Sequence, residues 1–536
     1  MGDGTGIARA GLLLLAGTIA SRLLGLVRDV VVSARFGTSG DLDLYVAAFR
    51  VPDLAFTLVS GGALGSALVP VFAQAFHGTA ATGEDPDDGP GHVRLVRLAG
   101  ATTLAVLIAA TLLAGLLAVF ADTLAPALGA GFSPESQARL AGLVRILLMQ
   151  PVLLGTGEVL ARFLNVRGRF LAVAFAPAAY TGGIVVAALV APVSIGTLAL
   201  AWGVVVGALL FLVILAVDAW RSGFRLPTAR AELTGTRSDL SEILRLMVPR
   251  VIGQGAVQLS FVATTRLASY LPAGGLSSLN YAWALMMLPL GAFAMTAANA
   301  AFPSFAALAA RGDRDGLAST GRRTVGTVAT AMAISTAAAV ALGSDAIEVL
   351  FGRRAFGPES VALTAAALVA YAVGLPAHGV LEVQMRLAFA LKDTRTPVVI
   401  GVGAMAVNVA VATLLAPALG HVGIAFSLSI AATIEAVLLG VVLESRLPGA
   451  HGVGLVVGLK IAAVATFAGL AGWGTSFALA VLGAPAHIRL VVGGVAYAAA
   501  AGASSWGFGV PEVAEIALAL WRRVRRRHTY PRTRPA

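Results

Sequence analysis

Residues 132–162 read FSPESQARLAGLVRILLMQPVLLGTGEVLAR, and residues 356–386 read FGPESVALTAAALVAYAVGLPAHGVLEVQMR. The two stretches align without a gap at an offset of 224, and 10 of their 31 positions are identical. Shared alanines carry little weight in a chain this rich in alanine, whereas shared proline, glutamate and arginine carry more. The matched positions of this kind are Pro134/Pro358, Glu135/Glu359, Glu158/Glu382 and Arg162/Arg386. The chain is therefore predicted to contain two copies of one structural repeat.

A weaker copy of an earlier segment extends the repeat. Three residue types recur later in the chain. Tyr45 corresponds to Tyr281, Pro52 to Pro289 and Pro70 to Pro303, at offsets of 236, 237 and 233 residues. Proline removes a backbone hydrogen bond and bends a helix. We therefore predict bent helices at matching places in the two copies, where they suit the lining of a cavity.

The composition excludes a water-soluble globule. Of the 536 residues, 58% are hydrophobic and 12% are charged, and the mean hydropathy is +0.87, whereas an ordinary soluble domain has about 25% charged residues. Apolar runs of about 18 residues or more recur along the chain and indicate helices that cross a bilayer. The alternating pattern of a membrane β-barrel is missing. The predicted fold class is an all-α polytopic membrane protein.

About fourteen transmembrane helices are expected. Their predicted ranges are 8–34, 44–76, 95–120, 138–163, 170–192, 195–218, 242–270, 277–309, 322–350, 360–391, 396–416, 421–444, 453–473 and 488–510. They form an N-terminal six-helix half (1–220), a cytoplasmic linker (221–241), a C-terminal six-helix half (242–445), two extra helices (446–520) and a basic cytoplasmic tail (521–536). Six helices separate the two copies, so the halves are parallel repeats, and transporters of this type bind their substrate between such halves.

The arginine and lysine residues predict the orientation in the membrane. If the N-terminus is cytoplasmic, 25 of the 38 fall inside, 5 fall outside and the remaining 8 lie within predicted helices. Both termini are therefore expected in the cytoplasm. The arginine-rich stretch 521–534 is interpreted as a topology anchor, or alternatively as a contact with anionic lipid headgroups.

The densest group of charges at membrane depth lies in SRLLGLVRD (21–29) and DLDLYVAAFRVPD (41–53). Such charges are costly and usually face a cavity or a partner. Arg22 and Arg28 lie six residues apart on the first helix, and Arg50 adds a third cation. Guanidinium groups suit phosphate and diphosphate, so we expect these arginines to bind a phosphorylated headgroup. The alternative is that Arg28 only ties helices together.

Other ionisable residues are expected to act as partners. Arg266, predicted to lie deep in the seventh helix, is a further candidate for the cavity. An anionic ligand would repel carboxylates, so the acids near the arginines are interpreted as structural or gating residues. The two glutamate–arginine pairs at i, i+4 are either a repeated structural ion pair or a cytoplasmic gate. The residues with these gating or structural roles are Ser21, Asp29, Asp43, Glu158, Arg162, Glu382 and Arg386.

Motifs for enzymatic chemistry are missing from the sequence. The chain has no cysteine, no histidine pair at i, i+4 and no GxxxxGK[ST] phosphate loop. We expect a transporter and not an enzyme, with no catalytic residue, no cofactor, no metal site and no nucleic-acid partner. Uphill transport would then draw on an ion gradient, on the membrane potential or on consumption of the product.

Several motifs resemble one known family. They are SRLLGLVRD (21–29), FGTSGDLDLYVAAFRVPDL (36–54), GGALGSALVPVFAQAF (61–76), YAWALMMLPLGAFAMTAANAAFPSFA (281–306) and LAFALKDTRTPVVIGVGAMAVNV (387–409). They are similar to the MurJ/MviN family of lipid II flippases, in the multidrug/oligosaccharidyl-lipid/polysaccharide exporter superfamily. The resemblance covers roughly residues 8–445, and the family also has fourteen helices.

This resemblance implies alternating-access export of lipid II, the undecaprenyl-diphosphate disaccharide-pentapeptide, across the bacterial plasma membrane for peptidoglycan synthesis. The family's cavity arginines fall on Arg22 and Arg28, its acidic position in the second helix on Asp43, and a basic position on Arg50. The implied partners are lipid II, membrane lipids, a coupling ion and other cell-wall synthesis proteins. The last two helices would form a groove for the lipid tail.

Three positions depart from the family pattern. An arginine found in many members is Phe56 here, an acidic residue is Gly61, and an arginine of the eighth helix is Ala284. A hypothesis is that Arg266 partly compensates. Two alternatives stay open: an exporter of another lipid-linked glycan or of drugs, and a non-transporting scaffold of the envelope machinery. A drug antiporter would more often show acidic cavity residues, whereas basic residues dominate the cluster in this chain.

Overall fold

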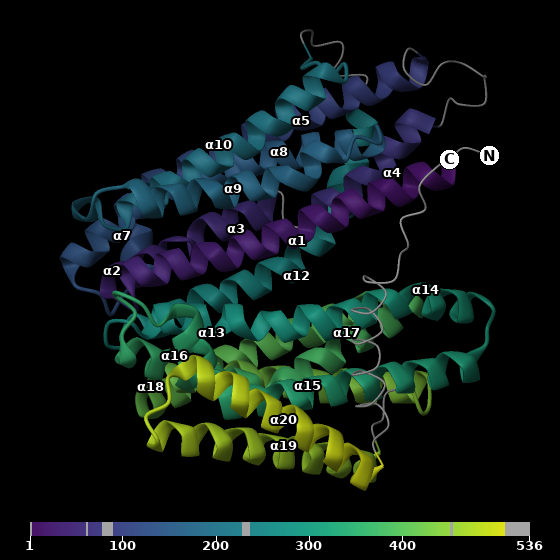
Figure 1. The fold of residues 1–536 in the computed structure, drawn as a ribbon. Helices are drawn as coiled ribbons and strands as arrows, with labels where there is room; N and C mark the ends of the chain where they lie inside the picture. The colour runs from purple at the N-terminus through teal and green to yellow at the C-terminus, as the bar shows by residue number, and fades with distance from the viewer. Residues whose placement is uncertain (1–2, 60–62, 78–88, 228–235, 451–453, 510–536) are drawn as a thin grey trace, which may run out of the picture. The chain divides into compact units, whose positions relative to one another are not determined.

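The computed structural model describes residues 3–59, 63–77, 89–227, 236–450 and 454–509 (Figure 1). Regular structure in these ranges is entirely helical. Nine of the described helices, or ten if one bent pair counts as a single span, are long and apolar enough to cross a bilayer. The predicted all-α membrane class is confirmed, while the number of fourteen spans stays a prediction. The predicted basic tail lies outside the described residues.

The chain packs into two compact units, residues 1–277 with 354–356 and residues 278–353 with 357–536. The helices of unit 1 are α1 (Asp3–Phe36), α2 (Gly40–Ala48), α3 (Arg50–Val59), α4 (Ala63–His77), α5 (Pro90–Val119), α6 (Ala121–Leu128), α7 (Pro134–Leu147), α8 (Met149–Val166), α9 (Leu171–Val190), a 3₁₀ turn (Val193–Ile195), α10 (Leu198–Arg221) and α12 (Arg237–Ala268). Within this unit α1 packs along α9, and α12 packs against α3 and α4.

Unit 2 contains the second copy of the repeat and the two C-terminal helices. Its elements are α13 (Gly275–Pro289, which begins in unit 1), a π-helical segment (Leu290–Met295), α14 (Thr296–Ala310), α15 (Arg314–Phe351), α16 (Pro358–Ala372), α17 (Leu375–Ala390), α18 (Arg395–Arg446), α19 (Leu455–Val481) and α20 (Ala486–Phe508). In Figure 1, α19 and α20 lie side by side beside α15.

The two copies of the repeat form the same local structure, a helix, a short break and a second helix. Pro134 begins α7 and Pro358 begins α16, because proline at the first helical position loses no intrahelical hydrogen bond. The first copy breaks at Leu148, and the second breaks between Ala372 and Leu375 with a bend of 45°. The break therefore recurs at the same place in both copies.

The second and eighth spans are interrupted near the prolines at which bends are predicted. In the second span α2 ends at Ala48 and α3 begins at Arg50, and Pro70 lies inside α4. In the eighth span, the π-helical segment directly follows Pro289. A π segment re-satisfies the backbone after an interruption of the regular ladder.

α18 joins two predicted spans into one element with a break at Gly420. This glycine has φ 59° and ψ −137°, a conformation essentially restricted to glycine. The two halves of α18 contact one another through the Ser427 hydroxyl, which donates to Asn408 Oδ1 at 2.9 Å. The break thus forms a helical hairpin with a buried polar link.

The core of unit 1 is made of apolar side chains from α4, α5, α8, α9, α10 and α12, including Leu68, Phe72, Leu95 and Phe163. The outward faces are also apolar: Leu112 is 69% exposed and Val190 is 77% exposed. Water-soluble monomers rarely expose such continuous apolar surface. These faces therefore suit contact with lipid.

Candidate functional site

α1 carries the first two arginines of the predicted cluster. Arg22 and Arg28 are six residues apart, which corresponds to about 9 Å along the helix axis. The Arg28 guanidinium donates to Asp29 Oδ1 from Nε at 2.9 Å and from Nη2 at 2.8 Å. Arg22 is exposed, and no acceptor among the described residues pairs with it. Arg22 is therefore the cation most open to a ligand.

Arg50 ties α3 to α12. Its Nε donates to the Thr265 hydroxyl at 2.9 Å, and its guanidinium lies over the Phe261 ring, 5.1 Å from the centroid. A hydroxyl and a ring face stabilise the cation without cancelling its charge. Arg50 thus links α3 to α12 through a hydrogen bond and a cation–π contact.

Arg266 lies in the last turn of α12, at the end of the helix and not deep inside it. Its Nη1 donates to the carbonyl oxygen of Ala127 at 2.6 Å, close to the end of α6. A cation at a helix C-terminus also interacts favourably with the helix dipole. The structure therefore places Arg266 as a cap on α6, and its proposed compensation for the missing family arginines stays a prediction.

Asp43 is 4% exposed and connects α2 to the turn before α13. Its carboxylate accepts backbone N–H bonds from Gly274 and Ser277, each at 2.7 Å. The first N–H groups of a helix have no acceptor within the helix. The carboxylate of Asp43, on a distant helix, supplies such an acceptor. This geometry fits the structural role expected for Asp43. Ser21, also expected to act as a partner, is half-buried on α1.

Three polar residues belong to the same region and are not among the predicted site residues. Tyr45 on α2 lies within electrostatic range of Arg28, Asp53 and Tyr180 on α9. Asp53 is also within range of Arg50, three residues earlier on α3. That i, i+3 spacing is a signal the sequence offers, whereas the approach of Tyr180 is a long-range contact with no local signal.

Both predicted glutamate–arginine pairs form. Arg162 Nη2 lies 2.5 Å from Glu158 Oε2 in α8. In α17, Arg386 Nη1 contacts Glu382 Oε2, and its Nη2 donates to Asn299 Oδ1 at 3.0 Å. The second pair thus has an added link from α17 to α14.

The first three helices carry the guanidinium groups of the predicted cluster and nearby carboxylates. Arg22, Arg28 and Arg50 supply guanidinium donors in α1–α3, and the carboxylates of Asp29 and Asp53 partly balance them. Among the residues that the structure describes, no three histidine, aspartate or glutamate side chains are grouped as metal ligands would be. Of the departures from the family pattern, Phe56 and Ala284 are half-buried and Gly61 lies outside the described residues.

Two solved structures have a fold similar to that of this chain. A structure described as a lipid II flippase MurJ in an inward closed conformation has a TM-score of 0.72 at 20% identity, covering 92% of this chain and 99% of that chain. An inward-facing multidrug resistance MATE family transporter of the MOP superfamily has a TM-score of 0.61 at 16% identity. The match covers 81% of this chain and 98% of that chain. The fold and the apolar helices define a multi-pass helical membrane protein. More particularly, the chain belongs to the lipid II flippase MurJ family, whose model matches residues 32–491.

Curated relatives agree with this family. A probable lipid II flippase MurJ of Bdellovibrio bacteriovorus is 31% identical over 456 residues, which is 83% of each chain. A probable lipid II flippase MurJ of Rhizobium meliloti is 30% identical, covering 79% of this chain and 78% of that protein. The lipid II flippase MurJ of Burkholderia cenocepacia is 28% identical, and the match covers 80% of this chain and 82% of that protein.

Proposed function

We propose that this protein moves lipid II, the undecaprenyl-diphosphate-linked peptidoglycan precursor, from the inner to the outer leaflet of the bacterial plasma membrane by alternating access. Family membership over residues 32–491 is the observation that carries the proposal. The arginines of α1 and α3 add a physical reason, because they are cations inside a membrane protein and need an anion or a carboxylate.

The diphosphate is the part of the substrate that these arginines recognise. Arg22 is exposed and has no acceptor among the described residues, so it is the first contact. A hydrogen bond from the Arg28 guanidinium to Asp29 is replaced by one to a phosphate oxygen. Arg50 contributes positive charge from α3. Bidentate guanidinium–phosphate contacts are strong and geometrically specific.

The remaining parts of the proposal concern orientation and partners. Both termini lie in the cytoplasm, as the distribution of basic residues predicts. The protein works as a transporter with lipid II, membrane lipids and a coupling ion as partners, and it contacts other cell-wall synthesis proteins. The Glu158–Arg162 and Glu382–Arg386 pairs hold the cytoplasmic ends of α8 and α17 in one state.

Complementation tests the proposal directly. The full chain is expressed in bacteria depleted of their own lipid II flippase, with insertion checked by membrane fractionation. We expect growth and export of lipid II to be restored. A well-expressed and correctly inserted protein that restores neither contradicts the proposal.

An exporter of another lipid-linked glycan or of drugs is the second candidate. Two specific observations favour it: the fold likeness to a MATE transporter, and the replacement of two family arginines by Phe56 and Ala284. Drug resistance conferred in the absence of lipid II export would identify this alternative.

A further inference from the structure

The bend between α16 and α17 in unit 2 has a local cause in the sequence. Pro376, in the first turn of α17, has no N–H and cannot donate to the carbonyl oxygen of Ala372, four residues earlier. Gly374 N donates to Tyr371 O at 3.0 Å, whereas in a regular α-helix it would donate to Ala370 O. The carbonyl oxygens of Ala370 and Ala372 therefore lose their regular helical donors.

Hydroxyl groups from two other helices replace these donors. Thr336 Oγ1, on α15, donates to Ala372 O at 2.7 Å, and Ser429 Oγ, on α18, donates to Ala370 O at 2.7 Å. Ser429 Oγ also lies 3.2 Å from Tyr371 O, and this serine is 2% exposed. Where a membrane helix is broken, serine and threonine side chains of neighbouring helices can bond the freed backbone groups. Two specific contacts thus stabilise the bent form.

Gly374 allows α18 to approach the bend closely. A Cβ at this position would lie 2.6 Å from Ser429 Oγ and 2.8 Å from Ser429 Cα, so a larger residue would push α18 away. In the first copy of the repeat, the equivalent residue at the offset of 224 is Gln150. The close approach seen at Gly374 is therefore specific to the second copy.

The first copy of the repeat has the same kind of break in a different shape. It also has a proline next to the break, Pro151. However, α7 and α8 together form one span of 33 residues, whereas α16 and α17 are bent by 45°. The repeated sequence therefore folds into a continuous form in unit 1 and a bent form in unit 2.

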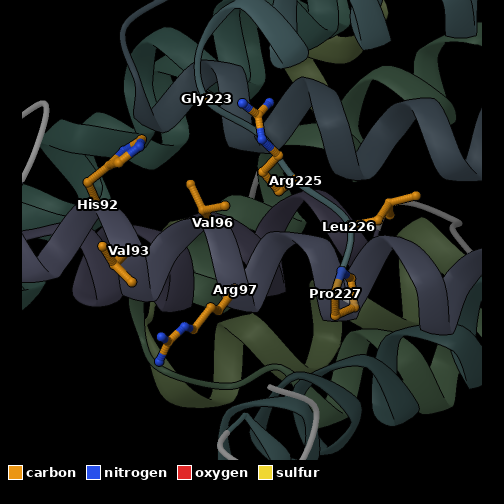
Figure 2. A pocket seen from close by; sticks show the side chains of 8 residues that line it. All are labelled: His92, Val93, Val96, Arg97, Gly223, Arg225, Leu226 and Pro227. Atoms are coloured by element: carbon orange, nitrogen blue, oxygen red, sulfur yellow. The ribbon is translucent and has the colours of Figure 1, made fainter. Parts of the chain in front are cut away.

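The first copy is anchored at the end of α8, away from its break. The Phe163 ring packs edge-on against Phe224, with centroids 5.5 Å apart. Arg167, directly after α8, has its Nη1 2.7 Å from His92 Nδ1. His92 lines a hollow that α5 forms with residues 223–227 (Figure 2). These contacts connect α8 to α5 and to the segment after α10, so the continuous form is held within unit 1.

We propose that Thr336 and Ser429 are positioning residues that hold α16–α17 bent, and that this element straightens toward the form of the first copy during transport. Both hydroxyls keep an acceptor in the straight form. Thr336 Oγ1 already lies 3.0 Å from Met332 O on its own helix, and a serine within a helix can bond the carbonyl oxygen four residues earlier. The role in transport rests on the proposed function, whereas the hold on the bend does not.

The distance between two spin labels on the purified full chain measures the bend. Since the chain has no cysteine, Glu359→Cys near the start of α16 and Phe389→Cys near the end of α17 attach the labels at exposed positions. At 1.5 Å per residue, removing the bend lengthens this element by about 3 Å. We expect Thr336→Val combined with Ser429→Ala to shift the distance distribution, measured by pulsed electron paramagnetic resonance, to longer values.

Thr330→Val is the matched control for the loss of a buried hydroxyl from α15. Thr330 is 1% exposed and donates to Gly326 O of its own helix at 2.8 Å, so its removal should leave the distances unchanged. Pro376→Ala restores the N–H donor to Ala372 O and should lengthen the distance with both hydroxyls in place. Unchanged distances in the combined variant, or an equal shift in Thr330→Val, would overturn the proposal.

Rescue of flippase-depleted cells tests the role in transport. Pro376→Ala should weaken the rescue at a normal protein level, and Thr330→Val should rescue as well as the unchanged chain. Failure of the unchanged chain to rescue would contradict the proposed function, while the distances still decide whether the hydroxyls hold the bend. Full rescue by Pro376→Ala with lengthened distances would overturn the role of the bend in transport.

Discussion

Single arginine residues in this protein show which groups accommodate a cation in a membrane protein. The Arg28 guanidinium forms an ion pair with Asp29 on its own helix. Arg50 contacts the Thr265 hydroxyl and a ring face, and Arg266 donates to a backbone carbonyl oxygen. Asp53 also lies within electrostatic range of Arg50. The carboxylates of Asp29 and Asp53 therefore partly balance the arginines of α1–α3.

Arg28→Ala should abolish rescue of flippase-depleted cells, because it removes both the charge and the donor geometry. Arg28→Lys should rescue only weakly, since an ammonium group cannot form a bidentate contact with phosphate. Growth and lipid II export are the measurements, with protein level checked in each strain. Arg139→Ala, which removes an exposed arginine paired with Asp41, serves as the control and should rescue fully. Full rescue by Arg28→Ala would remove Arg28 from the mechanism.

Asp43→Ala should destabilise the protein by about 3 kcal/mol, because two buried backbone N–H groups lose a charged acceptor. Thermal unfolding of the purified protein in detergent measures this loss. Asp41→Ala is the matched control: Asp41 lies two residues earlier in an exposed ion pair with Arg139, and such pairs contribute little. Similar unfolding temperatures for the two variants would show that the Asp43 contacts do not hold α2.

At the scale of elements, interrupted helices recur in both copies of the repeat. α7–α8 and α16–α17 break at equivalent positions, and the second and eighth spans are interrupted near matching prolines. An uninterrupted apolar helix satisfies its own backbone and has little reason to break. The conserved position of each break within the two copies indicates that the breaks belong to the repeat itself.

Gly420→Ala should lower the stability by about 1–3 kcal/mol, because a Cβ is strongly disfavoured at φ 59° and ψ −137°. Unfolding in detergent, followed by circular dichroism at increasing temperature, measures the loss. Gly403→Ala, in the same element with open space around its Cβ, should be neutral or slightly stabilising. A neutral Gly420→Ala would indicate that the hairpin of α18 does not need this conformation.

For the whole molecule, the sequence predicts the class of fold and the repeat but not the detailed site. Composition and apolar runs are enough for the all-α class, and the 224-residue offset marks two copies that share one local structure. Hydropathy averages over about 18 residues, so it does not reveal a one-residue break such as Leu148. The link from Arg50 to Thr265 spans 215 residues and depends on packing that no local pattern encodes. The same limit explains why Tyr180 is missing from the predicted site.

The predicted orientation leads to a labelling experiment that the chain makes simple, since it has no cysteine. Glu135→Cys and Asp315→Cys introduce one thiol each, on exposed positions in the first turns of α7 and α15. A membrane-impermeant maleimide should label Glu135→Cys in intact cells and Asp315→Cys only after lysis. The reverse pattern would invert the proposed topology.

The central claim is that the arginines of α1 and α3 recognise the diphosphate of a lipid-linked glycan. The most direct measurement is the dissociation constant of the purified full chain for lipid II and for a polyprenyl-linked analogue without the diphosphate. The account predicts tighter binding of lipid II, and a loss of about tenfold for Arg22→Gln and for Arg28→Gln toward lipid II alone. Equal affinity for both lipids, unchanged in both variants, would contradict it.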